Sequence, residues 1–170
     1  MAATGRAQND ILAESNQAKR DEIIGLLTTA YWMEIETVMN YVANSINPDG
    51  VRGREISQAL EADIAEELLH AQQFARRIKE LYGVVPGSMA FRPEQTSLQP
   101  PERQTDVVHV IRGVIDAENG AIAHYNRILE ATAEADPVTN DMVVDVLRGE
   151  QGHRRMFEGF LKEYEAEQRG

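Results

Sequence analysis

The chain has no cysteine among its 170 residues. Without cysteine there can be no disulfide, no thiolate zinc site, no CxxC redox motif and no cysteine-ligated iron–sulfur cluster. The sequence also lacks any run of about 18 apolar residues, so we expect no membrane-spanning helix and no membrane partner. The N-terminal segment up to Lys19 is polar and has no apolar stretch of the kind found in secretory signals. We therefore expect a cytoplasmic protein.

Clusters of basic residues are missing as well, and the formal net charge is −11. Phosphate binding needs clustered lysine and arginine, so we expect no nucleic-acid partner. An acidic chain suits a protein that draws cations inward, although solubility explains the excess almost as well. The short basic groups alternate with acids, as on solvated helix faces, and they lie at Arg52/Arg54, Arg76/Arg77/Lys79 and Arg154/Arg155.

Four glutamates stand at the centres of four apolar helical stripes. The chain is 42% hydrophobic and long enough for one domain of four long helices. Apolar neighbours at offsets of three, four, seven and eleven residues share one helix face with each glutamate, which places each carboxylate in the core. A buried unpaired carboxylate costs several kcal/mol, so four of them need a shared partner. The simplest shared partner is a metal centre held by Glu34, Glu67, Glu118 and Glu150.

Two of these glutamates are followed three residues later by a histidine. The pairs are Glu67 with His70 and Glu150 with His153. At this spacing both side chains lie on one face of a helix and can reach the same ion. We therefore add both histidines to the candidate ligands.

The other two glutamates are followed seven residues later by a tyrosine. The pairs are Glu34 with Tyr41 and Glu118 with Tyr125. Seven residues are two helical turns, so each phenol lies along the face that carries its glutamate. A hydroxyl in this position can hold a ligand carboxylate in place as an outer donor.

Turn and cap signals divide the chain into four helices in a single domain. We expect a polar tail over residues 1–20 and a helical bundle over residues 21–167. Asp136-Pro137 opens the last helix as cap and first-turn proline, and Thr105 is the expected N-cap of the third helix. The segment 84–104 contains four prolines and cannot be helical throughout. The expected helices cover about 21–45, 54–82, 106–133 and 137–167, and Gly83 is the glycine expected just past the end of the second helix.

The lengths of the connections predict the topology. Short links pair the first helix with the second, and the third with the fourth, as antiparallel hairpins. The segment 84–104 is long enough to cross the length of the bundle, and two hairpins joined by such a crossover are a known four-helix arrangement. The crossover has more apolar residues than a solvated loop needs, so we expect a neighbouring subunit to bury them: Val84, Val85, Met89, Phe91 and Leu98.

One glutamate from each of two helices, with Glu-x-x-His from each of the other two, resembles the di-iron carboxylate site of the ferritin-like superfamily. The resemblance covers roughly residues 21–164 in the family order. Residues 146–153, Val-Leu-Arg-Gly-Glu-Gln-Gly-His, are similar to the fourth-helix motif of bacterioferritins. Glu34 with Asn40-Tyr41 is similar to their first-helix motif, and small Dps-like ferritins share the site. The expected fold class is therefore an all-α, ferritin-like four-helix bundle.

The resemblance implies a ligand set and an activity. Two irons per subunit would be bridged by Glu67 and Glu150, and manganese or zinc also suits such ligands. Tyr41 and Tyr125 would be outer donors to Glu118 and Glu34, respectively, or to their neighbours. The implied function is a ferroxidase that oxidises Fe(II) with O₂ or H₂O₂ and stores the product in a homo-oligomeric shell. One iron would take Glu34 and His70, and the other Glu118 and His153.

Three departures from the bacterioferritin pattern matter. Bacterioferritins bind haem through a methionine directly after the glutamate of the first Glu-x-x-His, and this position is Leu68, so we expect no haem. Gly149 stands where they carry an acidic residue, so the surroundings of the fourth helix's ligands differ. The chain ends 17 residues after His153, too soon for the fifth helix of full-size ferritins. This favours a smaller shell of twelve subunits, with 24 as the alternative.

Other interpretations stay open. A di-iron or di-manganese oxidase or peroxidase without storage has the same ligands, whereas a rubrerythrin-like peroxidase needs cysteines that are absent. A metal-free structural bundle is the third class. Asp63 and Glu66 could hold iron in transit or be solvated acids without function. His109 and His124 lie on other faces of their helix, where we expect surface roles.

Overall fold

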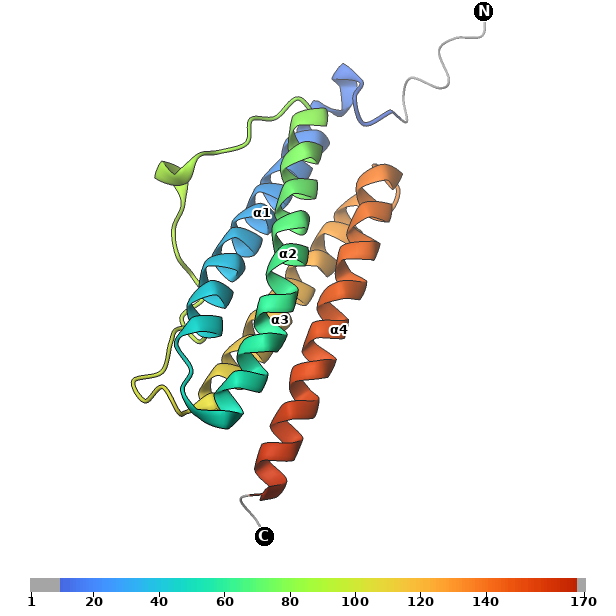
Figure 1. Cartoon of the computed structure of the whole chain (residues 1–170). Coiled ribbons are helices and arrows are strands. Elements are labelled where there is room, and N and C mark those ends of the chain that lie inside the picture. The colour runs from blue at the N-terminus through green and yellow to red at the C-terminus, as the bar shows by residue number, and fades with distance from the viewer. Residues whose placement is uncertain (1–9, 168–170) are drawn as a thin grey trace, which may run out of the picture.

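The computed structural model describes residues 10–167, and this part of the chain is a bundle of four long helices (Figure 1). Two short 3-10 turns, η2 (Glu14–Asn16) and η3 (Ser88–Ala90), complete the described secondary structure, which contains no strand. The predicted all-α, four-helix architecture is confirmed. The long helices are α1 (Gln17–Ile46), α2 (Gly50–Glu80), α3 (Val107–Thr132) and α4 (Pro137–Glu167).

The helices form two antiparallel hairpins. α1 packs chiefly on α2, and α3 packs chiefly on α4. The connection between α2 and α3 runs down the length of the bundle beside α1, so α2 and α3 point in the same direction (Figure 1). The predicted crossover topology is therefore correct. None of the helices within residues 10–167 is long and apolar enough to span a bilayer.

The ends of α2 differ from their expected positions. The helix begins at Gly50, four residues before the predicted Arg54, and Gly50 has a φ of 89°, a conformation that glycine adopts without a steric penalty. It ends at Glu80, and the residue with positive φ is Tyr82, at 68°, rather than a glycine. Gly83 then donates its N–H to the carbonyl of Ile78 over 2.8 Å, which closes the helix end.

Aspartates cap the N-terminal ends of α3 and α4. The N-cap of α3 is Asp106 rather than the predicted Thr105, because the Asp106 carboxylate accepts the backbone N–H of His109 at 3.1 Å. In α4, Asp136 accepts the backbone N–H of Thr139 at 3.1 Å, as the sequence indicated.

The N-terminal part of the bundle is longer than predicted. α1 begins at Gln17, four residues early, and Ile11 is already buried against the core. The Arg20 guanidinium donates to the carbonyl of Ile11 at 3.0 Å, which holds this segment against the bundle. Of the predicted polar tail 1–20, residues 1–9 lie outside the described structure.

The crossover is fastened to α1 by polar contacts that the sequence did not reveal. The buried Glu36 carboxylate accepts the backbone N–H groups of Glu94 and Gln95 at 2.9–3.0 Å. Further along, the Asn44 amide donates to the carbonyl of Leu98 at 3.0 Å. These bonds satisfy backbone groups of a segment that has little secondary structure of its own.

The apolar residues of the crossover have two different environments. Leu98 is only 1% exposed and packs in the core of its own chain, and Val85 also packs against the core. Val84 and Met89 are 81% and 90% exposed. The expectation that a neighbouring subunit buries the whole set is therefore wrong for Leu98, because α1 and α3 already bury it.

The apolar core is divided into two clusters along the bundle. One contains Leu27, Phe74 and Val143, and the other contains Leu60 and Phe157. On all four helices the predicted glutamate and histidine positions, six in total, fall between these clusters. The fold thus places a polar layer in the middle of an otherwise apolar interior.

Candidate metal centre

Six side chains converge in the polar layer. Each carboxylate is at most 3% exposed, and both histidines are buried. The side chains form two overlapping groups, and within each group one ligand atom per residue lies within 4.8 Å of the others. Glu67 and Glu150 belong to both groups, which are Glu34, Glu67, His70 and Glu150, and Glu67, Glu118, Glu150 and His153. The structure thus brings together all six residues singled out in the sequence.

Each histidine turns its Nδ1 atom toward the opposite hairpin. His70 Nδ1, from α2, lies 3.0 Å from Oε1 of Glu150 on α4. His153 Nδ1, from α4, lies 3.0 Å from Oε1 of Glu67 on α2. The spacing to the glutamate on the same helix is 3.6 Å for His70 and 3.4 Å for His153. The two Glu-x-x-His motifs therefore interlock across the bundle.

Buried atoms without a hydrogen-bond partner test whether metal ions fit this cluster. Four such atoms are Oε1 of Glu67, Nδ1 of His70, Oε1 of Glu150 and Nδ1 of His153. Buried polar atoms are rarely left unpaired, so each one needs an explanation. All four belong to the candidate ligands, and mixed carboxylate and imidazole donors suit Fe(II), manganese or zinc. The residues therefore fit two divalent ions.

Two buried tyrosines hold the remaining carboxylates. The Tyr41 hydroxyl donates to Oε1 of Glu118 at 2.6 Å, and the Tyr125 hydroxyl donates to Oε1 of Glu34. Burial raises the pKa of both phenols, and the neighbouring carboxylates raise it further. Both phenols therefore stay protonated and act as donors, each to the glutamate of the other hairpin.

The four carboxyl groups divide into two electrostatic classes. Burial raises the pKa of Glu34 and Glu118 well above the ordinary value, and the charges of Glu150 and Glu67 raise it further. Burial opposes ionisation of Glu67 and Glu150 too, but the close approach of the two imidazoles outweighs it. The pKa of Glu67 is lowered, and that of Glu150 falls to about 2.

The imidazoles complete this charge balance. Burial lowers the pKa of both rings, but the Glu150 and Glu67 carboxylates outweigh it and raise the pKa to about 9 for His70 and about 12 for His153. Without metal, these shifts favour charged pairs between the two imidazoles and the Glu67 and Glu150 carboxylates, and they favour the neutral forms of Glu34 and Glu118.

The other polar candidates lie outside the two ligand groups. Asp63 and Glu66 approach the outer nitrogens of the histidines. His109 is exposed, and its Nε2 lies 3.0 Å from the carbonyl of Gln99. The expectation of a surface role is wrong for His124, which is buried with Nε2 2.8 Å from the carbonyl of Leu26 and so links α3 to α1.

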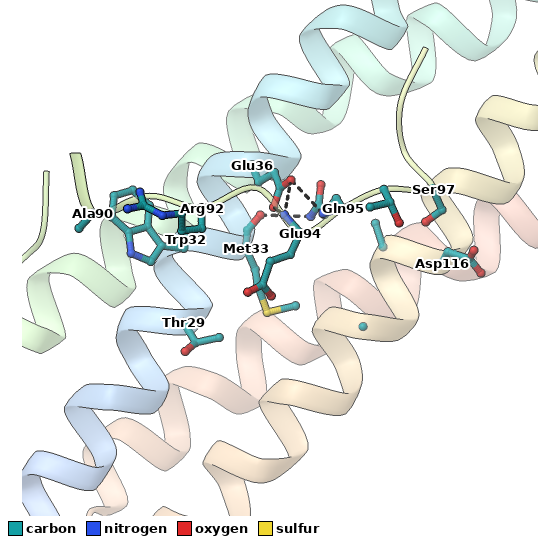
Figure 2. Close-up of a pocket in the computed structure, with 13 residues that line it drawn as sticks. Thr29, Trp32, Met33, Glu36, Ala90, Arg92, Glu94, Gln95, Ser97 and Asp116 are labelled. Carbon is teal, nitrogen blue, oxygen red and sulfur yellow. Dashed lines mark hydrogen bonds between the residues drawn. The ribbon is translucent and has the colours of Figure 1, made fainter. Parts of the chain in front are cut away.

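A pocket of about 440 Å³ lies beside the cluster, between α1, α3 and the crossover (Figure 2). Met33 extends from α1 toward α3, where its Cε lies 3.9 Å from the position of a Cβ on Gly120. Trp32, Arg92 and Asp116 also line the pocket. None of its lining residues is one of the six candidate ligands, so the pocket flanks the centre without exposing a ligand atom.

Comparison with known proteins decides the family. The model of the ferritin-like domain matches residues 24–166, which is most of the chain. The chain belongs to the ferritin-like family. The order of elements and the position of the six side chains in the bundle agree with that assignment.

Two relatives match most of the chain. The DNA protection during starvation protein of Pyrococcus furiosus is 26% identical over 156 residues, which are 90% of this chain and 84% of that protein. The bacterioferritin of Desulfovibrio desulfuricans is 24% identical over 148 residues, 86% of this chain and 78% of that protein. These relatives confirm the predicted resemblance to bacterioferritins and Dps proteins.

Solved structures confirm the fold. A bacterioferritin-related protein from Bacteroides fragilis, described as a dodecameric thioferritin, has a TM-score of 0.77 and 22% identity, covering 98% of each chain. The Desulfovibrio desulfuricans bacterioferritin, described with its diiron site, has a TM-score of 0.76 and 22% identity, covering 88% of this chain and 84% of that one.

Proposed function

We propose that this ferritin-like chain is a ferroxidase, which binds two Fe(II) ions per subunit and oxidises them with O₂ or H₂O₂. The observation that carries the proposal is the pair of overlapping ligand groups, which share Glu67 and Glu150 and contain four buried ligand atoms that have no hydrogen-bond partner. Iron is the substrate here, although manganese or zinc would suit the same donors. Haem is not part of the proposal, because Leu68 stands at the methionine position described above.

The shared carboxylates set the geometry of the reaction. Carboxylates that belong to both groups hold two ions about 3.5–4 Å apart, so that two Fe(II) can each give one electron to the same oxidant. Glu34 and Glu118 give up their protons on binding, and the tyrosine hydroxyls keep them oriented. Four carboxylates then balance the charge of two divalent ions inside a buried site. No side chain has to act as a nucleophile.

Storage in a homo-oligomeric shell is the second part of the proposal, with twelve subunits as the expected number and 24 as the alternative. The Bacteroides fragilis relative is described as dodecameric. The strongly exposed Val84 and Met89 of the crossover offer apolar surface for a subunit contact. We keep the cytoplasm as the expected location, and the net charge of −11 argues against nucleic acid as a partner.

The alternative is a di-iron or di-manganese oxidase or peroxidase without storage. An enzyme of this kind that acts on an organic substrate needs a pocket that opens onto the ligands. The pocket beside Met33 exposes none of the six ligand residues (Figure 2). The geometry therefore favours small oxidants over an organic substrate.

Stopped-flow oxidation of Fe(II) tests the activity. Glu67→Ala and Glu150→Ala should each remove the fast phase, because loss of a shared carboxylate weakens both metal positions. His109→Ala is the matched control and should keep the original rate, since His109 is exposed and outside both ligand groups. An unchanged rate in Glu67→Ala would contradict the assignment of the site.

Light scattering of the purified protein tests the assembly. A particle of twelve subunits is expected. A 24-subunit particle would show that the chain forms the larger cage instead. A stable monomer or dimer would contradict storage and move the function to the enzyme class.

A further inference from the structure

The outer nitrogens of both candidate ligand histidines face the same carboxylate. Glu66, one residue before Glu67 on α2, places Oε1 3.8 Å from Nε2 of His70 and Oε2 3.5 Å from Nε2 of His153. Asp63 approaches only His153, with Oδ1 3.7 Å from Nε2. The two oxygens of Glu66 thus divide between the two rings, one from each hairpin.

This arrangement matters because of the way the rings are oriented. Nδ1 of each histidine points into the cluster, so a neutral imidazole that binds metal there carries its proton on Nε2. An acceptor for that N–H fixes the tautomer and the ring orientation and raises the basicity of the ligand. Glu66 is the side chain that approaches both Nε2 atoms, and a small shift of this half-exposed side chain would bring each of its oxygens within hydrogen-bond distance of one ring. It belongs to neither ligand group.

Gly149 supplies the space that Glu66 occupies. A Cβ at position 149 of α4 would lie 3.0 Å from Oε1 of Glu66 and 3.3 Å from Cε1 of His70. A side chain there would therefore push away the carboxylate, the ring or both. Gly152, one turn further along the same helix, has no such neighbour within 4 Å. Glycine inside a helix is normally disfavoured, so the close approach at position 149 gives it a physical reason.

We propose that Glu66 is a positioning residue for the metal centre, the common outer acceptor of His70 and His153, and that Gly149 is the gap that lets it reach both rings. The inference rests on the proposed metal-binding function and deepens it. Glu66 holds both Nδ1 atoms toward the metal positions without touching the metal itself.

Anaerobic titration of the full-length protein with Co(II), followed by visible absorption and calorimetry, tests this role. Glu66→Gln and Gly149→Ala should each weaken Co(II) binding about 10–100-fold and change the ligand-field spectrum, as loss of an outer partner typically does. The glutamine amide can accept from only one of the two rings. Gly152→Ala is the matched control and should bind like the parent.

A double variant shows whether Glu66 and Gly149 act together or affect metal binding independently. If Gly149 acts through Glu66, Glu66→Gln combined with Gly149→Ala should bind about as weakly as either single variant. Glu66→Gln is nearly isosteric, and the Glu66 side chain is 49% exposed, so this variant should fold normally.

Three results would overturn the proposal. Gly149→Ala could bind Co(II) with the parent's affinity and spectrum, or the two losses could multiply in the double variant. Glu66→Gln could bind normally and only slow the movement of iron away from the centre, which would make Glu66 a transit residue. A parent protein that binds no Co(II) would overturn the proposed function first and this inference with it.

Discussion

The Tyr41 hydroxyl on α1 donates a 2.6 Å hydrogen bond to Oε1 of Glu118 on α3, which links the two hairpins inside the bundle. Tyr125 on α3 makes the reciprocal bond to Glu34 on α1. The pair places one buried donor beside each carboxyl group whose pKa is raised. These bonds tie the ligands to the fold even before metal binds.

Tyr41→Phe should lower the free energy of unfolding of the metal-free protein by about 1–3 kcal/mol, because it leaves a buried oxygen of Glu118 without its donor. Urea unfolding monitored by circular dichroism measures the change. Tyr82→Phe is the control: Tyr82 is 69% exposed, so its change should stay within about 0.5 kcal/mol. Equal stability of the Tyr41→Phe variant and the parent would show that the bond contributes nothing.

Binding of two divalent ions at neutral pH should release about four protons per subunit, one each from Glu34, Glu118, His70 and His153. Burial and the charges of Glu150 and Glu67 raise the pKa of Glu34 and Glu118, and the same two carboxylates raise the pKa of both histidines against the opposing effect of burial. Calorimetry with Co(II) in buffers of different ionisation enthalpy counts the protons. Release close to zero would mean that the metal-free cluster is already deprotonated.

The metal-free protein should lose stability as the pH rises above neutral. His70 has a folded-state pKa of about 9, above the ordinary value of 6.5, so its contribution is complete below about pH 6.5 and is lost as the pH rises through 9. Glu150 acts in the opposite range, since its lowered pKa makes its contribution disappear as the pH falls toward 2. Thermal unfolding between pH 6 and 10 checks the alkaline side.

His70→Gln removes one of the two titrating imidazoles and should make the decline between pH 6.5 and 9 shallower, while His153, whose pKa is raised to about 12, keeps contributing to it. A parent protein whose Tm stays constant across that range would contradict the charged pairing of His70 with Glu150 and Glu67.

A buried ion pair joins the hairpins at the end of the bundle away from the α1–α2 turn. Arg77 Nη2 lies 2.8 Å from Oδ1 of Asp136, and Arg77 Nε donates to Thr139. Arg77→Ala should cost about 3–5 kcal/mol of unfolding free energy, because it leaves the buried Asp136 charge without its partner. Chemical unfolding measures the cost.

A second substitution separates charge from lost volume. Asp136→Asn in the Arg77→Ala background removes the unpaired charge and keeps a helix-capping side chain, so it should recover part of the stability. If the double variant is no more stable than Arg77→Ala, the lost stability comes from the missing volume of the Arg77 side chain and not from the unpaired Asp136 charge.

The ligand positions could be predicted from the sequence because they follow the helical period. Each candidate ligand stands in an apolar stripe, and the three- and seven-residue spacings relate each glutamate to a histidine or tyrosine on its own helix. The helical period did not specify which helix each tyrosine would meet across the core, and only the family resemblance implied that Tyr41 meets Glu118 and Tyr125 meets Glu34. Tyr41 reaches Glu118 rather than Glu34 because the crossover topology places α3 beside α1.

Other features depend on contacts between distant segments and leave no periodic trace. Glu36 looks like an ordinary helix acid until the crossover brings two backbone N–H groups against it. Gly149 could be recognised as a departure from the bacterioferritin pattern, but its reason is the position of Glu66 on a different helix. Leu98 is a similar case. Its apolar side chain packs in the core of its own chain, which only the path of the crossover in the folded structure reveals.

Anaerobic titration with Fe(II) tests the central claim most directly, because it counts the ions that the six buried ligands hold. The parent should bind two Fe(II) per subunit, and its Tm should rise with the concentration of free metal, since the ions bind the folded state. Glu67→Ala should lose both equivalents together, because Glu67 belongs to both ligand groups. A parent that binds no Fe(II), or a number far from two, would contradict the account.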